Sequence, residues 1–309
     1  MKKIFIDGSA GTTGLRIHER LSSRKDLTVL TLPDDKRKDP QARKEMLNSV
    51  DVAFLCLPDD ASREAVAMME NPLVTVIDAS TAHRTLDSWA YGFPELSTSF
   101  QEKIKQSNRI AVPGCHASGF IALIYPLIAN GILPKDVDLT AHSLTGYSGG
   151  GKKMIESYEE GNREFLLGSP RQYGLGQTHK HLPEMVKTTG LKNAPAFSPI
   201  VGDFYSGMQV TVPIFSKWLT FGSVKDIKEI YKNLYTGEIV KYVPNADESG
   251  FLSSTRLAGK DSMQIEVYGN DERILLVARY DNLGKGASGA AIECMNIKLG
   301  LAPETGLVL

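Results

Sequence analysis

The chain has 309 residues, which is enough for two domains of ordinary size rather than one small core. Hydrophobic residues make up 42% and charged residues 23%, the proportions of a soluble globular protein. The formal net charge is −1, from 35 Lys and Arg against 36 Asp and Glu. This balance excludes the strongly basic surface of a nucleic-acid-binding protein and the charge pattern of a membrane-surface protein.

No segment predicts export, membrane insertion or a metal site. The start, MKKIFIDG, reaches Asp7 after three apolar residues, too few for a secretory signal. The most apolar stretch, residues 119–133, is interrupted by Pro126 and Asn130 and is too short to span a bilayer. The three cysteines show no zinc-like spacing. We therefore expect a cytoplasmic protein with reduced thiols and no metal.

The first third of the chain alternates between β-prone and helical segments. Residues 51–57, DVAFLCL, form an almost continuous apolar run, typical of a strand buried on both faces. The other predicted strands are 2–7, 27–32 and 73–80, with helices over 15–23, 39–49 and 62–70 between them. Alternation with short links predicts a parallel sheet covered on both faces.

From about residue 115 the pattern changes. Alternating apolar residues in 204–215 and 261–282 predict antiparallel strands, the second segment forming a hairpin around Gly269. Further elements are a helix after a turn at Cys115, a strand over 137–146 leading into a glycine-rich loop, a helix over 154–167 and a last helix over 285–300. The predicted order is an α/β part, a mixed or antiparallel part and a closing helix.

A glycine-rich segment, GSAGTTG over residues 8–14, joins the first predicted strand to the first helix. Glycines permit a tight turn and close approach to a phosphate, and a helix N-terminus offers N–H groups and positive potential. The spacing is GxxGxxG rather than GxGxxG, so an ordinary turn is the alternative. The position within a βαβ unit favours a dinucleotide site. Its expected contacts are Gly8, Ser9, Gly11, Thr12, Thr13 and Gly14.

The segment LPDDKRKD, after the second predicted strand, bears on the choice of dinucleotide. Asp34 and Asp35 suit a ribose, as an acid at this distance does in NAD sites. Lys36, Arg37 and Lys38 suit a 2′-phosphate. We predict NADP from the basic cluster, with a solvated charged loop as the alternative.

The motif VPGCHASG sets one cysteine apart from the other two. Cys56 and Cys294 lie in apolar or helical segments and are expected to fill the core. Cys115 follows Pro113 and Gly114 and leads into a predicted helix, whose dipole favours the thiolate. We predict that Cys115 is a nucleophile; the alternative is a small residue in a structural turn.

A thiolate nucleophile needs an acid/base partner. In THKHLPEM, His181 stands at the start of a predicted helix with a proline in its first turn, and Glu184 stands one turn on. A carboxylate there can orient an imidazole. The alternative is a pair of surface histidines. We give His116 little weight, because neighbouring side chains diverge, place His83 near the cofactor and expect His142 to be packed.

Three motifs in order, VPGCHASG, THKHLPEM and YDNLGKGASGAAIECMN, resemble the N-acetyl-γ-glutamyl-phosphate reductases. The segment GSAGTTGLRIHERL resembles the compact second type of that family. The resemblance implies a fold similar to aspartate-semialdehyde and glyceraldehyde-3-phosphate dehydrogenases. That fold has an N-terminal Rossmann domain, an α+β catalytic domain with a mixed or antiparallel sheet and a C-terminal helix returning to the first domain. It predicts an NADP-binding domain in 1–114 and 285–309 and a catalytic and dimerisation domain in 115–284.

The resemblance also implies the reaction. NADPH reduces N-acetyl-glutamyl 5-phosphate to N-acetylglutamate 5-semialdehyde and phosphate through a thioester on Cys115. His181 matches the acid/base residue, and Glu184 orients it or contacts the substrate. Arg84 and Ser148 match substrate-side residues, and Asn282, Lys285 and Gly286 match a segment that closes over the nicotinamide. The expected partners are a small acyl phosphate and further copies of the chain, as a homodimer or homotetramer, without nucleic acid or membrane.

Two other functions compete with this reading. One is an aspartate-semialdehyde dehydrogenase, but Gly114 stands where that enzyme has Asn before its cysteine. The other is a nucleotide-sensing Rossmann protein without catalysis, which the joint presence of Cys115, His181 and Glu184 argues against. The chain departs from the longer type of the reductase family at His116, where that type has Tyr, and in GGGK, where it has GAGR.

Overall fold

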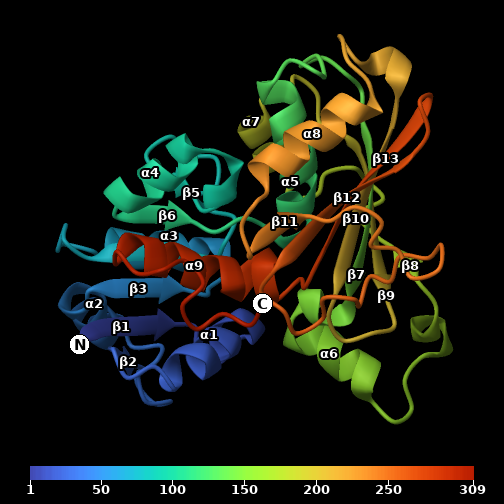
Figure 1. Ribbon diagram of the computed structural model, residues 1–309. Helices are drawn as coiled ribbons and strands as arrows, with labels where there is room; N and C mark the ends of the chain where they lie inside the picture. Colours follow the sequence, from blue (N-terminus) through green and yellow to red (C-terminus); the bar gives the residue numbers. More distant parts are fainter. The chain divides into compact units, whose positions relative to one another are not determined.

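A computed structural model describes all 309 residues. The chain divides into two compact units (Figure 1). The first unit comprises Met1–Gly114 and Ala287–Val308, and the second comprises Cys115–Gly286 and Leu309. The C-terminal segment that belongs to the first unit thus begins at Ala287, two residues after the predicted boundary at Lys285.

The first unit is built on a sheet of six parallel strands in the order β2-β1-β3-β4-β6-β5. The strands are β1 (Lys2–Asp7), β2 (Leu27–Leu30), β3 (Val52–Leu55), β4 (Thr75–Asp78), β5 (Ala90–Tyr91) and β6 (Arg109–Ala111). The strand order reverses between β1 and β3, which are adjacent. In open α/β sheets, the carboxyl ends of the strands at such a reversal form the ligand-binding crevice.

Helices cover both faces of this sheet because its strands are apolar on both faces. The helices are α1 (Thr12–Ser22), α2 (Pro40–Ser49), α3 (Asp59–Ala67), α4 (Thr98–Gln106) and α9 (Gly289–Lys298), with a 3-10 turn η1 (Pro94–Leu96). Along β1, Ile4 and Ile6 pack into one core with α1, α4 and α9, whereas Phe5 packs into the other with α2 and α3. The two-residue period of a strand produces this division.

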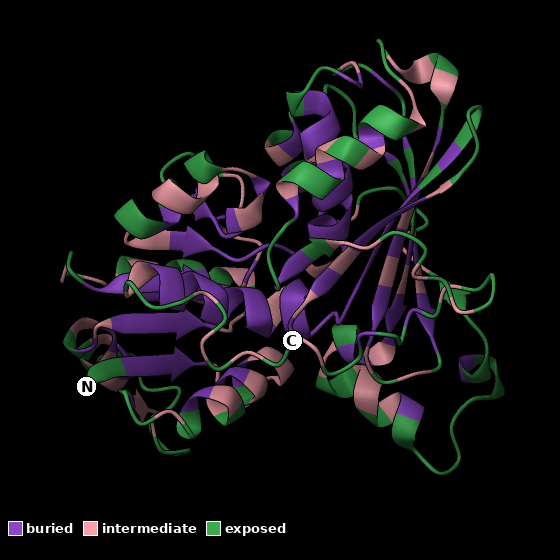
Figure 2. Ribbon diagram, viewed as in Figure 1, coloured by how far each residue is buried: buried purple, intermediate pink, exposed green.

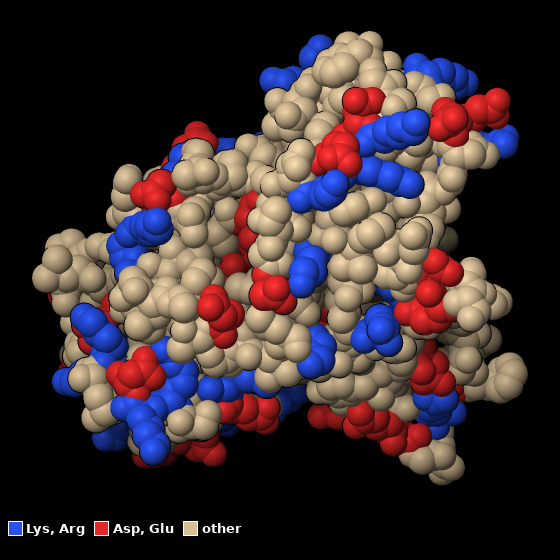
Figure 3. Space-filling model, in the orientation of Figure 1, with Lys and Arg blue, Asp and Glu red and all other residues tan.

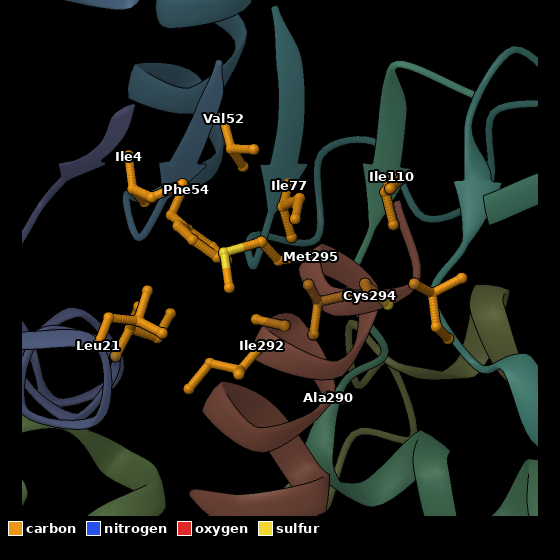
Figure 4. Packing of buried hydrophobic residues seen from close by; sticks show 14 of the residues in the cluster. Ile4, Leu21, Val52, Phe54, Ile77, Ile110, Ala290, Ile292, Cys294 and Met295 are labelled. Carbon is orange, nitrogen blue, oxygen red and sulfur yellow. The ribbon is translucent and has the colours of Figure 1, made fainter. Parts of the chain in front are cut away.

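The C-terminal helix α9 is an internal element of the first unit. It packs against β4 and α4 and is buried along nearly its whole length (Figure 2). Ile292, Cys294 and Met295 lie in one cluster with Phe54 and Ile77 of the sheet (Figure 4). The prediction of a closing helix that returns to the first domain is confirmed.

The second unit is built on a mixed sheet of seven strands in the order β11-β12-β13-β10-β7-β9-β8. The strands are β7 (Thr140–Gly146), β8 (Arg171–Gln172), β9 (Ala196–Gly202), β10 (Met208–Phe215), β11 (Val240–Tyr242), β12 (Met263–Gly269) and β13 (Arg273–Tyr280). The pairs β7–β9 and β11–β12 are parallel and the others antiparallel. The predicted hairpin at Gly269 joins β12 to β13.

The helix α5 is the centre of the second unit and packs against β10, β13, α7 and α8. The helices are α5 (Cys115–Ala129), α6 (Lys152–Glu159), α7 (Leu182–Thr189) and α8 (Val224–Leu234), with shorter turns η2 (Tyr147–Gly150), η3 (Phe165–Gly168), η4 (Ser216–Trp218) and η5 (Gly284–Ser288).

The helix α5 runs through Pro126, although this residue cannot donate a backbone hydrogen bond to Ala122 one turn earlier. The hydroxyl of Tyr235, the C-cap residue of α8, donates to that carbonyl at 2.6 Å. The neighbouring Tyr231 donates to the Leu123 carbonyl at 2.5 Å. A tertiary contact thus supplies the hydrogen bond that the proline removes, and the helix continues.

Candidate active site

Cys115 is the first residue of α5, rather than part of a turn before the helix as the sequence predicted. It is partly exposed. Cys294 is completely buried, and burial raises the pKa of the Cys56 thiol to about 12. Cys115 is therefore the one thiol that combines access with the positive end of a helix dipole, the setting of reactive cysteines.

Tyr280, the last residue of β13, attaches the start of α5 to the sheet. Its hydroxyl donates to the Cys115 carbonyl at 2.5 Å and accepts from the Gly119 N–H at 3.0 Å. A Cβ atom on Gly119 would lie 2.7 Å from the hydroxyl oxygen, so a glycine permits this approach. Burial, and then the charge of a Cys115 thiolate, raise the pKa of Tyr280, which keeps its hydroxyl a donor.

His116, to which we gave little weight as the acid/base partner, is a buried residue next to Cys115 in the chain. Its Nδ1 lies 2.6 Å from the Ser143 hydroxyl on β7, and its Nε2 lies 2.6 Å from the Tyr173 hydroxyl. Burial lowers the pKa of His116 to about 3, so the imidazole is neutral at physiological pH. Burial, and then the charge of a Cys115 thiolate, raise the pKa of Tyr173.

His179 and His181 join His116 in a cluster of three imidazoles. The centroid of the His181 ring lies 4.7 Å from that of His179 and 5.7 Å from that of His116. His181 is the N-cap of α7, and a proline occupies the first turn, as the sequence predicted. Burial lowers the pKa of His179, and the nearby charge of Lys180 acts in the same direction.

Glu184 lies in the first turn of α7 with 1% of its surface exposed. This helix packs against α5, which begins with Cys115. A carboxylate in the first helical turn is favoured by the positive end of the dipole. The predicted pair of His181 and Glu184 therefore lies at the start of one helix, within the buried interior of the second unit.

Ser148 and Asn282, predicted to lie on the substrate and cofactor sides, contact each other. The Asn282 side-chain amide donates to the Ser148 hydroxyl at 3.0 Å, and its oxygen accepts from the Gly207 N–H at 2.9 Å. Both side chains are buried. Asn282 therefore joins the loop after β7 to the start of β10.

The predicted pair Lys285 and Gly286 lies in the turn η5. A Cβ atom on Gly286 would lie 3.1 Å from the Cβ of Cys115, so the absence of a side chain lets this turn pack against the nucleophile. Lys285 is 1% exposed. Asp281 accepts hydrogen bonds from the N–H groups of Leu283 and Gly284 at 2.7 and 3.2 Å. The sequence analysis missed Asp281, Tyr173 and Tyr280.

Arg84, the predicted substrate-side arginine, lies in the first unit. Its Nε donates to the Val112 carbonyl at 2.8 Å, and its Nη2 donates to the Ala79 carbonyl at 2.9 Å. His83 beside it is buried, lies 2.6 Å from the Asp78 carboxylate and stacks on Trp89. These contacts fix both side chains against the carboxyl end of the first sheet.

The glycine-rich loop lies where the strand order of the first sheet reverses. Gly8 has φ of +86°, and a Cβ atom there would collide with the carbonyl of Cys56, which follows β3. A Cβ atom on Gly14 would lie 2.9 Å from the Cα of Ser9. Helix α1 begins after Gly11 with neither a side-chain cap nor an acidic residue in its first turn. Its N-terminal N–H groups therefore suit an anion.

Ser9, Thr12 and Thr13 are partly exposed around this helix start. Side-chain hydroxyls there add hydrogen-bond donors to those of the backbone. The loop therefore fits the phosphate groups of a dinucleotide, both in its backbone conformation and in its donors.

The charged loop after β2 is exposed. This exposure is compatible both with a site for the 2′-phosphate of NADP and with a solvated loop. Arg37 lies 3.3 Å from Asp34, whereas Lys36 and Lys38 point into solvent. The carboxylate that ends β1, Asp7, is buried and accepts two hydrogen bonds from Arg43 of α2. Burial raises the pKa of Asp7, and the Arg43 guanidinium opposes that rise.

His142, which we expected to be packed, is exposed on β7, so that expectation was wrong; the inward position belongs to its neighbour Ser143. No group of His, Cys, Asp and Glu side chains is arranged to hold a metal ion. None of the helices is both long and apolar enough to cross a bilayer.

On the face drawn in Figure 3, basic and acidic side chains are interspersed.

Comparisons with known proteins agree with this architecture. Residues 3–107 match the family described as semialdehyde dehydrogenase, NAD binding domain, and residues 115–282 match its dimerisation domain. An aspartate semialdehyde dehydrogenase II from Vibrio cholerae has a TM-score of 0.73 at 16% identity, over 97% of this chain and 98% of that one. This likeness shows the fold alone, and the predicted two-domain fold is confirmed.

Sequence relatives identify the family. The chain is 46% identical to N-acetyl-gamma-glutamyl-phosphate reductase 2 of Nostoc sp., over 99% of both proteins. It is 44% identical to the Pseudomonas putida protein of the same name over 98% of both, and 46% identical to the Sinorhizobium medicae reductase over 96% of this chain and 98% of that one. The resemblance seen in the three motifs is confirmed: the chain belongs to the N-acetyl-gamma-glutamyl-phosphate reductase family.

Proposed function

We propose that the protein catalyses the NADPH-dependent reduction of N-acetyl-glutamyl 5-phosphate to N-acetylglutamate 5-semialdehyde and inorganic phosphate. One observation carries the proposal. Cys115, a partly exposed thiol, starts a buried helix beside a cluster of three histidines, in a chain 46% identical to a reductase of that name. An acyl phosphate needs a thiolate and an acid/base group, and the second unit supplies both.

The first step is acyl transfer to Cys115. The thiolate attacks the acyl carbon, a sulfur–carbon bond forms, and the carbon–oxygen bond to phosphate breaks with its electron pair leaving on inorganic phosphate. The thiol proton passes to His181. The start of α5 stabilises the thiolate through its dipole.

Because His116 stays neutral, the proton released by the Cys115 thiol has one acceptor in this proposal, His181. With its pKa lowered to about 3 by burial, His116 takes no proton near neutral pH, and the pKa of His179 is lowered as well. His181 therefore becomes cationic without a second imidazolium beside it. Glu184, in the first turn of α7, is the carboxylate that supports that charge in this proposal.

The cofactor supplies a hydride to the thioester carbonyl when it is bound. We propose that the loop from Gly8 to Gly14, with Ser9, Gly11, Thr12 and Thr13, holds its phosphates, and that Lys36 and Lys38 favour NADP over NAD. As the tetrahedral carbon on Cys115 collapses to the aldehyde, the sulfur leaves as a thiolate. His181 returns the proton that it holds to this sulfur, which restores the thiol for the next cycle.

We assign substrate contacts to Arg84 and Ser148 and cofactor contacts to Asn282, Lys285 and Gly286. The contact between Ser148 and Asn282, and the packing of Gly286 against Cys115, support grouping the last four around the thiol. A guanidinium such as that of Arg84 suits a phosphate or carboxylate oxygen.

We also propose that the protein is a homodimer or a homotetramer. The second unit matches a dimerisation domain. On β10, Met208, Val210 and Val212 are buried, whereas the alternate residues Gln209, Thr211 and Pro213 are partly exposed. Only one face of this strand is therefore fully covered within the chain, and the other is available to a second copy.

The reaction is tested with N-acetyl-glutamyl phosphate by following NADPH oxidation and phosphate release together. The proposal predicts equal amounts of both and a clear preference for NADPH over NADH. Turnover of aspartyl phosphate in its place would transfer the chain to the aspartate-semialdehyde dehydrogenase activity. Dinucleotide binding without turnover of either acyl phosphate would favour the sensor function.

A further inference from the structure

A cavity of about 420 Å³ opens in the second unit. It lies among α6, η3, β8 and β9. Its volume is within the range of about 300–1,000 Å³ that small-molecule sites occupy. Neither the acyl transfer nor the cofactor contacts described above use it.

One side of the cavity is apolar. Tyr158, Leu167 and Val201 form a buried cluster, and Met154 and Tyr173 pack against it. These five side chains all line the cavity. Such a wall suits a methyl or short acyl group rather than a sugar or a second phosphate.

The polar side of the cavity is cationic. Lys153 and Arg171 line it, and no acidic residue does. Both are exposed, and neither forms an ion pair with an acidic side chain. By contrast, Asp203 holds the nearby Arg163 through both of its carboxylate oxygens. Two unpaired cations beside an apolar wall suit a ligand with one carboxylate and one apolar group.

Tyr173 connects this cavity to the nucleophile. It lines the cavity, and its hydroxyl lies 2.6 Å from Nε2 of His116, the residue after Cys115. Burial, and then the charge of a Cys115 thiolate, raise the pKa of Tyr173. Tyr173 therefore belongs both to the cavity wall and to the surroundings of the residue after the nucleophile, and a ligand that passes Tyr173 would reach both.

We propose that this cavity is the subsite for the end of the substrate remote from the reacting carbonyl. Lys153 and Arg171 bind its α-carboxylate, and Met154, Leu167 and Val201 contact the methyl of its N-acetyl group. The inference rests on the proposed function and extends it, because it explains how an N-acylated acidic amino acid is selected over a shorter acyl phosphate.

The test removes the carboxylate from the substrate and the cations from the protein. In the phosphate-dependent direction, N-acetylglutamate semialdehyde is compared with 4-acetamidobutanal, the same aldehyde without the carboxylate. We expect wild type to prefer the first by about 100-fold or more in kcat/KM, since two charge-assisted hydrogen bonds are lost. In the double variant Lys153→Gln and Arg171→Gln, the preference should fall to about tenfold or less, mostly through KM.

Lys225→Gln is the matched control, because Lys225 is an exposed lysine on α8 that does not line the cavity. It should keep the full preference for the carboxylate. An unchanged preference in the double variant, with near-wild-type turnover, would overturn the subsite.

A second readout separates the subsite from the reaction. N-acetyl-L-glutamate should protect Cys115 of wild type from iodoacetamide, and 4-acetamidobutyrate should protect it far less; the double variant should lose the difference. If N-acetyl-L-glutamate protects Cys115 selectively but the wild-type protein shows no turnover, the proposed reaction is refuted and the subsite is retained. Equal protection by both compounds in wild type would refute the subsite whatever the turnover.

Discussion

The hydroxyl of Tyr280 lies 2.5 Å from the carbonyl oxygen of Cys115. The same hydroxyl accepts from the N–H of Gly119, one helical turn later. Strand β13 therefore holds the first turn of the helix that carries the nucleophile. A thiolate in acyl transfer must be held within a fraction of an ångström of its productive position, so this contact bears on the rate as well as on the fold.

Tyr280→Phe should lower kcat by about tenfold and destabilise the protein by about 1–3 kcal/mol, because two buried backbone groups lose their partner. Steady-state kinetics and urea unfolding measure the two effects. Tyr235→Phe is the matched control, since that hydroxyl also binds an α5 carbonyl, at Ala122, but two turns from Cys115. It should cost similar stability and leave kcat near wild type. Equal falls in kcat for both variants would show that Tyr280 acts through stability alone.

Gly119→Ala should destabilise the protein by about 1–3 kcal/mol, as overpacking in a core does. The added Cβ atom would lie 2.7 Å from the Tyr280 hydroxyl and 2.7 Å from Val210, both in the buried interior. Gly168→Ala is the comparison, because a Cβ atom there meets nothing within 4 Å. Urea unfolding should separate the two variants clearly. Equal stabilities would mean that β13 moves freely away from α5.

His116→Phe should reduce kcat by about tenfold or more, because it removes the hydrogen bond to the Tyr173 hydroxyl and the one to Ser143 that orients the imidazole. His116→Gln should retain most of the activity, since its amide offers one donor and one acceptor and remains neutral. The kcat values and their pH profiles distinguish the two variants. Equal losses in both would point to the shape of the imidazole rather than to its hydrogen bonds.

Stability should fall as the pH is lowered from about 6.5. The pKa of His116 is about 3 in the folded chain, below its ordinary value of 6.5, so the unfolded chain binds the proton more readily. This histidine's contribution is therefore complete above about pH 6.5 and is lost progressively towards pH 3, about 2 kcal/mol of it by pH 5. Urea unfolding at pH 7 and pH 5 should show a smaller difference in His116→Gln than in wild type. The same pH dependence in both proteins would assign the effect to other groups.

Iodoacetamide at neutral pH should modify Cys115 well before the other two cysteines. Cys294 has no exposed surface, and burial raises the pKa of Cys56 to about 12, so neither offers an accessible thiolate. Peptide mapping over time gives the three rates. Comparable rates would remove the basis for treating Cys115 as activated.

Much of the fold follows from local patterns. The apolar run DVAFLCL predicted a strand buried on both faces, and β3 lies inside the parallel sheet. The predicted helix after Cys115 continues through Pro126, and the sequence did not indicate the compensating hydroxyl of Tyr235, which comes from 113 residues later in the chain. At β7 the strand was predicted, but the expectation that His142 is packed assigned the wrong face to the interior. His142 therefore faces outward and Ser143 inward, the one-residue difference that separates the two faces of a strand.

The residues of the candidate site that were predicted from the sequence are those in short motifs. Cys115 in VPGCHASG and His181 in THKHLPEM stand at helix starts, which proline and glycine mark in the sequence. Tyr173 and Tyr280 were missed because their roles depend on contacts 57 residues from His116 and 165 from Cys115. No spacing within a motif indicates such partners.

The most direct test of the account is mass spectrometry of the protein mixed with N-acetyl-glutamyl phosphate in the absence of NADPH. We predict one N-acetylglutamyl group per chain, attached to Cys115 through a thioester that hydroxylamine removes, and none on Cys115→Ala. An acyl group on another residue, or turnover by wild type with no acylated Cys115 after rapid quenching, would contradict the central role given to this thiol.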